Sequence, residues 1–184
     1  GGVFLYSPLE LARRAADIDI ARELGAEGGV FGCLRPDGSL DTEANAMLME
    51  HAKGLSVTFH RAFDRCADPR KALEELIAQG FDRILTSGQQ PTALEGTPQR
   101  KAHHEQANGR IILLAGCGVN EQNIATIAQA TAIHEFHFSA RTAVKSKMMF
   151  SNPDVYMGAK DADEDTLNIT SAERVANTIA QLCK

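Results

Sequence analysis

The sequence lacks the features that mark membrane proteins and exported proteins. Its longest uninterrupted apolar stretch covers residues 111–119, nine residues in all, whereas a helix needs about 20 apolar residues to cross a bilayer. No basic segment followed by an apolar one opens the chain, so the sequence predicts no export signal. We therefore expect a soluble protein that does not act on a membrane.

An excess of positive charge is also missing. The 184 residues include 19 Lys and Arg against 24 Asp and Glu, which gives a formal net charge of −5 at pH 7. The basic residues are scattered as pairs, whereas a nucleic-acid-binding domain gathers them into one patch. We therefore expect no nucleic-acid partner.

Paired cysteines are absent as well. Cys33, Cys66, Cys117 and Cys183 lie far apart, and no two of them form a CxxC motif. This spacing favours neither a disulfide framework nor a zinc module. Unpaired thiols of this kind are typical of a reducing compartment, so the sequence predicts a cytoplasmic protein.

The chain instead contains a regular alternation of strand and helix. Runs of β-branched and aromatic residues, typical of strands, cover residues 27–34, 55–61, 83–88, 110–118 and 135–141. Their first residues lie 28, 28, 27 and 25 positions apart. A repeat of this length indicates helical crossovers between parallel strands, and the predicted fold class is therefore α/β.

Helix-starting signals lie between these strands. Ser7 is followed by proline and, three residues on, by glutamate, which is a capping box. Asp68 precedes a proline at the start of a second helix, and Asn120 is expected to cap a helix that runs to about residue 130. Thr170 with a glutamate three residues later predicts one more capping box, which begins the last helix.

The number of strands leaves two architectures open. Eight strand–helix units at this spacing need about 225 residues or more, and only five strands can be recognised. The chain is therefore either an open five-stranded sheet or a TIM-type barrel without its first three strands. Both arrangements place ligand sites at the carboxyl ends of the strands.

Two histidines are predicted at those carboxyl ends. Val57 and Phe59 alternate with Thr58 and His60, and the polar set is expected to face the interior. In the last strand His137 shares its face with Ser139 and Arg141. His60 and His137 are therefore candidate acid or base catalysts, although each could instead be a core histidine bonded to a neighbour.

A charged pair follows His60 directly. Arg61 and Asp64 lie where the strand passes into a loop. They could form a plain ion pair, or Asp64 could orient Arg61 as a clamp for a carboxylate or phosphate, which the planar guanidinium fits. Asp64 is also a candidate acid or base.

Two glycine-containing strand ends could bind an anion through backbone N–H groups. Gly116 and Gly118 precede a predicted helix, and Ser87 lies in a similar but weaker Thr-Ser-Gly turn one strand earlier. The glycines could equally be needed only for a tight turn. If the strands at 110–118 and 135–141 are strands seven and eight of a barrel, the turn with Gly116 and Gly118 occupies the usual phosphate position.

Metal ligands cannot be assigned from local spacing. His103 and His104 are adjacent on a predicted helix and diverge by about 100°, so they would not chelate one ion well. Met148 and Met149 fit simple packing. Cu(I) needs soft sulfur ligands, and no local cluster of them is present.

Six segments form one recognisable set. They are residues 1–7 (GGVFLYS), 57–64 (VTFHRAFD), 85–88 (LTSG), 93–96 (ALEG), 115–118 (AGCG) and 136–141 (FHFSAR). Their order and spacing resemble the CutC copper homeostasis family over essentially the whole chain. The Thr-Phe-His-Arg-Ala-Phe-Asp block is the most specific part.

The resemblance implies a cytoplasmic TIM-barrel protein associated with copper tolerance and copper binding. It implies that Gly1 and Gly2 belong to the loop after strand three, so that residues 1–184 form a single partial barrel domain with strands 4 to 8. The family's N-terminal cysteines, the obvious copper ligands, would then be missing. Nine residues carry over as the rim of the barrel: His60, Arg61, Asp64, Ser87, Gly116, Gly118, His137, Ser139 and Arg141.

Three functional hypotheses follow. The chain could handle copper ions, as the resemblance implies. It could be an enzyme that acts on a small anionic or phosphorylated metabolite, with Arg61 as the clamp and His60 or His137 as the acid or base. It could also be a fragment that is soluble only as a homo-oligomer, because missing strands expose sheet edges and apolar surface.

Overall fold

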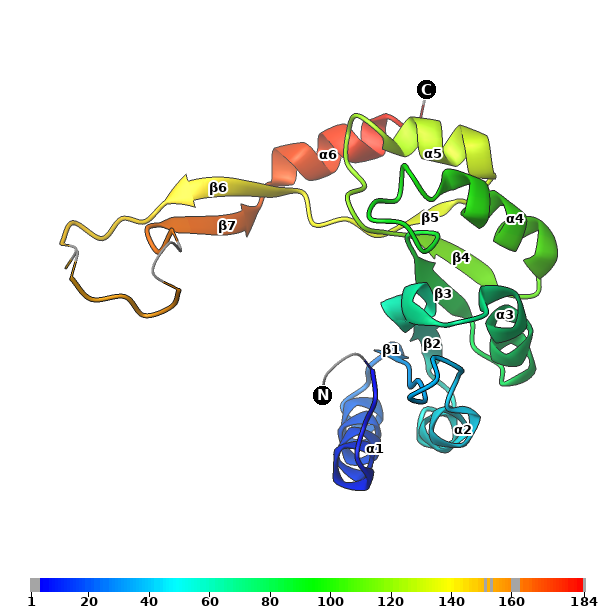
Figure 1. Ribbon diagram of the computed structural model, residues 1–184. Coiled ribbons are helices and arrows are strands. Elements are labelled where there is room, and N and C mark those ends of the chain that lie inside the picture. Colours follow the sequence, from blue (N-terminus) through cyan, green and yellow to red (C-terminus); the bar gives the residue numbers. More distant parts are fainter. Residues whose placement is uncertain (1–3, 151, 153, 160–162, 184) are drawn as a thin grey trace.

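The computed structural model has an α/β fold and describes residues 4–150, 152, 154–159 and 163–183 (Figure 1). The helices are α1 (Pro8–Glu23), α2 (Thr42–His51), the short 3₁₀ helix η1 (Arg61–Arg65), α3 (Pro69–Ala78), α4 (Thr97–Ala107), α5 (Ile124–Thr131) and α6 (Ala172–Ala180). The strands are β1 (Gly28–Phe31), β2 (Ser56–Phe59), β3 (Arg83–Thr86), β4 (Ile112–Ala115), β5 (Glu135–Phe136), β6 (Arg141–Lys145) and β7 (Thr166–Thr170). Gly1 and Gly2, on which the expectation about the opening loop rests, lie outside the described residues.

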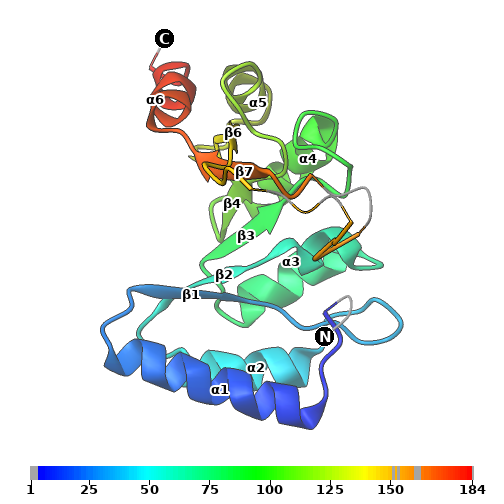
Figure 2. The ribbon, with the colours of Figure 1, turned by 90° about the vertical axis from the view of Figure 1, so that its left-hand side faces the viewer.

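The first five strands form one parallel sheet in the order β1-β2-β3-β4-β5. This confirms the predicted α/β class, and each observed strand lies inside its predicted range. Helices α2 to α5 cover the convex face of the curved sheet (Figures 1 and 2), as in part of a TIM-barrel wall. Val57 and Phe59 point toward them and are buried, as the alternation in β2 predicts.

The opposite, concave face remains open in the described part of the chain. Val30 and Ile112 on this face are 62% and 40% exposed. A polar link crosses it: Arg83 of β3 donates from Nε to Glu135 of β5 at 2.6 Å and from Nη1 to Ser56 Oγ of β2 at 2.7 Å. Three strands are therefore connected by side chains on this face as well as by their backbones.

Two of the predicted helix starts are confirmed and two are displaced. Ser7 forms the capping box of α1 with Glu10, and Asp68 caps α3. The helix expected from Asn120 begins only at Ile124, because residues 120–123 form a turn first. The last helix is capped by Ser171, since Thr170 pairs in β7.

The structure adds an antiparallel ribbon that the sequence analysis does not predict. The expected strand 135–141 ends at Phe136, and Arg141 instead begins β6, which pairs with β7. Met148 and Met149 lie in the connection between these strands and are 74% and 100% exposed, so the expectation that they pack internally is wrong. The ribbon projects away from the sheet (Figure 1).

The assignment of residues 1–184 to a single partial barrel domain stays a prediction.

Across the ranges that the structure describes, no helix combines the length and the apolar character that a membrane span requires.

Candidate functional site

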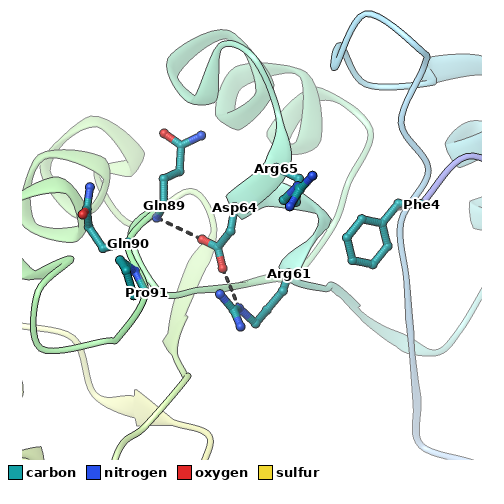
Figure 3. Close-up of a pocket in the computed structure, with 7 residues that line it drawn as sticks. All are labelled: Phe4, Arg61, Asp64, Arg65, Gln89, Gln90 and Pro91. Atoms are coloured by element: carbon teal, nitrogen blue, oxygen red, sulfur yellow. Dashed lines mark hydrogen bonds and ion pairs between the residues drawn. The ribbon is translucent and has the colours of Figure 1, made fainter. Parts of the chain in front are cut away.

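A cavity of about 480 Å³ lies at the carboxyl ends of β2 and β3. Phe4 lines one side of it (Figure 3). Three residues of η1 also line it, namely Arg61, Asp64 and Arg65, and the loop after β3 contributes Gln89, Gln90 and Pro91. The predicted pair of Arg61 and Asp64 therefore lies in a concave site, at the end of the sheet where α/β proteins bind ligands.

Asp64 is nearly buried and its carboxylate is saturated with hydrogen bonds. Its side chain is 5% exposed. It accepts from Thr86 Oγ1 at 2.5 Å, from the backbone N–H of Ser87 at 3.0 Å and from that of Gln89 at 3.1 Å. The N–H groups of the turn after β3, which could have bound an external anion, are therefore occupied by a carboxylate of the same chain.

The remaining strong partner of Asp64 is Arg61. Its Nε donates to Asp64 Oδ2 at 2.7 Å and its Nη2 to Ser87 Oγ at 3.1 Å. Partial burial alone lowers the pKa of Arg61, but the hydrogen bond and charge of Asp64 outweigh it and raise that pKa. The guanidinium therefore stays positively charged, and two hydrogen bonds hold its position. The side chain of Arg61 is still 41% exposed.

These contacts favour one of the two roles considered for the pair. Asp64 orients Arg61 and ties η1 to the loop after β3, so it acts as a positioning residue. Its assignment as an acid or base stays a prediction that this geometry does not favour, because its oxygens already accept several hydrogen bonds from fixed donors.

Cys117 lies beside the same guanidinium, and sequence reasoning did not connect the two. Its charge is one of the smaller causes that raise the pKa of Arg61, and its Sγ donates to the carbonyl of Pro91 at 3.1 Å. Its backbone is in the left-handed region with φ +82°, which is uncommon for a residue other than glycine. The turn after β4 therefore brings this thiol against Pro91 of the cavity wall.

His60 packs against the edge of the site. Its ring centroid lies 4.7 Å from that of Phe4, and its Nδ1 accepts the backbone N–H of Ala62 at 3.3 Å. Since Nδ1 is an acceptor, the neutral ring carries its proton on Nε2. Burial lowers the pKa of His60 below its ordinary value, so it is neutral near pH 7.

His137 lies at the same end of the sheet but not next to His60. It follows β5 as His60 follows β2, and it neighbours Gly116, where a methyl group would lie 3.6 Å from its Nδ1. Three inter-strand spacings separate β2 from β5, about 14 Å along the sheet. The two histidines thus share an edge, as predicted, but each would act by itself.

The other predicted residues are not among those that line the cavity. Ser87 contacts Arg61, as described, and Gly118 accepts hydrogen bonds at its carbonyl from Asn120 and Asn123. Ser139 and Arg141 lie at the base of the ribbon, where their carbonyls accept from Thr170 and Arg174. Their roles as ligand contacts stay predictions.

Sequence reasoning missed most of the cavity wall. Gln90 and Pro91 belong to a loop without a recognisable motif, and only the position of the Thr-Ser-Gly turn indicated that this loop matters. Arg65 ends η1, and Phe4 lies in the segment 1–7, which no argument had linked to Arg61. The backbone of Gln89 is in the left-handed region with φ +57°. This conformation is uncommon for glutamine and is not predicted from the residue type.

The buried thiols are poor metal ligands. Burial raises the pKa of Cys33 to about 11, and burial with the charge of Asp64 raises that of Cys66 to about 12, whereas copper binds the thiolate. Within the described ranges, no group of three or more His, Cys, Asp or Glu could hold a metal ion. The described His, Cys, Asp and Glu residues therefore do not form a preformed copper site.

Alkylation should separate the cysteines into two classes. With native protein at mildly alkaline pH, we expect iodoacetamide to label exposed Cys183 and half-exposed Cys117 first, and Cys33 and Cys66 roughly tenfold or more slowly. Mass spectrometry of peptides measures each rate, and labelling in urea is the control that should make all four similar. Rapid labelling of Cys66 in the native protein would contradict this.

Comparison with known proteins agrees with the resemblance seen in the sequence. The model of the CutC family matches residues 1–142. The chain is 58% identical over 180 residues to a CutC family protein of Bacteroides thetaiotaomicron, which covers 97% of this chain and 72% of that protein. It is 43% identical over 183 residues to a CutC family protein of Vibrio cholerae. This match covers 98% of this chain and 72% of that protein.

A solved structure is similar too. The Streptococcus agalactiae protein described as "Putative Copper Homeostasis Protein CutC" aligns with a TM-score of 0.72 and 38% identity, over 74% of this chain and 67% of that one. The chain thus spans about 72% of the length of the curated relatives, with a matching fold. It belongs to the CutC family.

Proposed function

We propose that this chain works in copper homeostasis in the cytoplasm, and that its cavity at Arg61 binds a small anionic or phosphorylated molecule. The name of the streptococcal protein supports the cellular role, and four free cysteines favour a reducing compartment. The single observation that carries the anion site is the guanidinium of Arg61, which Asp64 and Ser87 hold at a cavity.

The binding chemistry follows from how Arg61 is held. A guanidinium has five N–H donors in a rigid fork, and only Nε and Nη2 are engaged by Asp64 and Ser87. The other N–H groups of Arg61 can reach a ligand in the cavity. Arg65, which also lines the cavity, adds a second positive charge. His60 and His137 are the candidate acid or base groups if the bound anion reacts.

Calorimetric titration with inorganic phosphate and glycerol 3-phosphate tests the anion site. We expect millimolar or tighter binding, and Arg61→Ala should weaken it roughly tenfold or more. Arg61→Lys should restore only part of the affinity, because lysine keeps the charge without the fork.

The matched control for this titration is Arg13→Ala, which removes the same charge from the exposed surface of α1 and should leave the affinity unchanged. Thermal unfolding of each variant verifies that it folds. Absence of binding by either probe, or equal binding by Arg61→Ala, would refute the anion site.

Direct copper binding is the second candidate, and family membership supports it. Its ligands stay unassigned, because the thiols with raised pKa and the spacing of the other donors do not provide a preformed site. Cys117 is half-exposed and contacts Pro91 of the cavity wall. An anaerobic Cu(I) titration against a chromophoric chelator decides the question, with Cys117→Ala as the variant and Cys183→Ala as its control. Affinity no greater than that of an unrelated protein would exclude a high-affinity site in this chain.

A further inference from the structure

A second cavity lies beside the one at Arg61. Its volume is about 300 Å³, and Arg65 lines both cavities. Phe4 lines the first cavity, and Leu5, the next residue along the chain, lines the second. The two cavities are therefore neighbours that share the side chain of Arg65.

The 3₁₀ geometry of η1 explains why Arg65 does not join the pair of Arg61 and Asp64. Side chains three positions apart eclipse one another in this type of helix, so Arg61 Nε reaches Asp64 Oδ2 at 2.7 Å. Arg65 is turned from Asp64 by about 120°, because the helix has three residues per turn. Within the described part of the chain, its guanidinium makes no hydrogen bond or ion pair. Its charge is therefore available to a ligand in either cavity.

The second cavity has a largely apolar wall. It is lined by Leu5, Leu34, Arg35, Pro36, Gly38 and Arg65. Leu5 is 46% exposed, which leaves much of a large apolar side chain uncovered beside the cation of Arg65. Pockets that bind small organic molecules combine apolar walls with a few polar groups in this way.

Arg35 does not make the second cavity another anion site. Its Nε lies 4.0 Å from the carboxylate of Asp41, and its Nη2 lies 3.8 Å from that of Glu43. Two carboxylates thus flank one guanidinium, so this side of the cavity carries no excess of positive charge. The second cavity therefore offers apolar surface to a ligand.

Backbone hydrogen bonds fix both sides of the second cavity. The N–H of Leu34 donates to the carbonyl of Phe4 at 2.9 Å, and the N–H of Ala67, just after η1, donates to the carbonyl of Gly38 at 2.9 Å. Phe4 has φ +69°, and non-glycine residues held in this region often lie at ligand sites. Figure 3 shows that the ring of Phe4 projects toward the two arginines of η1.

We propose that the molecule bound at Arg61 is a phosphate ester with an aromatic or apolar body, and that this body extends past Arg65 into the second cavity. The guanidinium of Arg61 fits the phosphate. The ring of Phe4 and the planar guanidinium of Arg65 offer faces on which a flat ring stacks. Leu5 and its apolar neighbours cover the rest of the body. This inference rests on the proposed anion site and adds that the body of the ligand determines specificity.

Fluorescence titration with 1-naphthyl phosphate tests the proposal, and displacement by ribose 5-phosphate or inorganic phosphate gives their affinities. The chain contains no Trp, so the naphthyl emission can be followed separately. Ribose 5-phosphate carries the same charged group on a polar body. We expect 1-naphthyl phosphate to bind roughly tenfold or more tightly than either of the other two probes, because only its body gains from apolar burial.

Leu5→Asn should weaken the binding of 1-naphthyl phosphate roughly tenfold and leave the affinity for inorganic phosphate within about threefold of the original. Leu24→Asn is the matched control, because it makes the same substitution at the other end of α1, where Leu24 is 83% exposed. It should change neither affinity. Thermal unfolding verifies that each variant folds, and Leu5→Ala replaces Leu5→Asn if that variant does not.

The titrations distinguish failure of this inference from failure of the anion site. If none of the three probes binds, the anion site is wrong and the inference falls with it. If inorganic phosphate binds through Arg61 but 1-naphthyl phosphate binds no more tightly than ribose 5-phosphate, only the extension into the second cavity is overturned. Tight binding of 1-naphthyl phosphate that Leu5→Asn and Leu5→Ala leave unchanged also overturns it.

Discussion

Asp64→Ala should lower the free energy of unfolding by about 3 kcal/mol. The substitution leaves Thr86 Oγ1 and the backbone N–H groups of Ser87 and Gln89 without their acceptor, and an unsatisfied buried polar group costs about 1–3 kcal/mol. Water that enters from the cavity satisfies part of this set, so the costs do not add fully. Urea denaturation followed by circular dichroism measures the loss.

Asp64→Asn should separate the two tasks of this carboxylate. The amide oxygen can still accept from Thr86, Ser87 and Gln89, but the amide nitrogen then faces Arg61 Nε donor to donor. We expect a smaller loss of stability, about 1 kcal/mol, with anion affinity reduced as strongly as in the alanine variant. Asp17→Ala, at an exposed pair on α1, should change stability by less than about 0.5 kcal/mol. If all three variants are equally stable, Asp64 does not organise the site.

Gly96→Ala should be about as damaging, with a loss of about 3 kcal/mol or more. A methyl group on Gly96 would overlap the carbonyl oxygen of Ser87 and lie 3.0 Å from the Cα of Gly88. Both contacts are backbone atoms, so relief requires the loop after β3 to move as a whole. That movement would shift the Ser87 hydroxyl that holds Arg61, and anion affinity should fall with stability.

The control for Gly96 is Gly29→Ala in β1. A methyl group there meets nothing within 4 Å, and alanine has less conformational freedom to lose on folding than glycine. We expect the stability to be unchanged or slightly higher. Thermal unfolding compares the two variants directly, and an equal midpoint for both would show that the loop after β3 can shift without cost.

The sequence predicted the sheet well because its strands carry strong local signals. The strand-like runs recur at a nearly constant spacing, and this spacing by itself indicates parallel strands joined by helices. The ribbon was not predicted because about twenty positions of the sequence separate Val144 from Leu167 and Ile169. The pairing of β6 with β7 depends on a register that local periodicity does not contain.

The sequence predicted which charged residues belong to the site, but it did not predict how the loops around them are arranged. Arg61 and Asp64 are three positions apart in a turn, so their contact follows from local geometry. The contact of Arg61 with Cys117 depends on how two turns from different strands converge, and the left-handed backbone at Cys117 has no marker in the residue type. Loop conformation is decided by tertiary packing, which propensities do not describe.

The link from Arg83 to Glu135 has a consequence for the cavity. These side chains belong to strands separated by β4, and they meet on the inside of the curve. Side chains on the inside of a bend converge, so flattening would pull the guanidinium and the carboxylate apart. The ion pair between Arg83 and Glu135 therefore opposes flattening of the sheet. It helps to keep the carboxyl ends of β2 to β5 pointing toward a common centre.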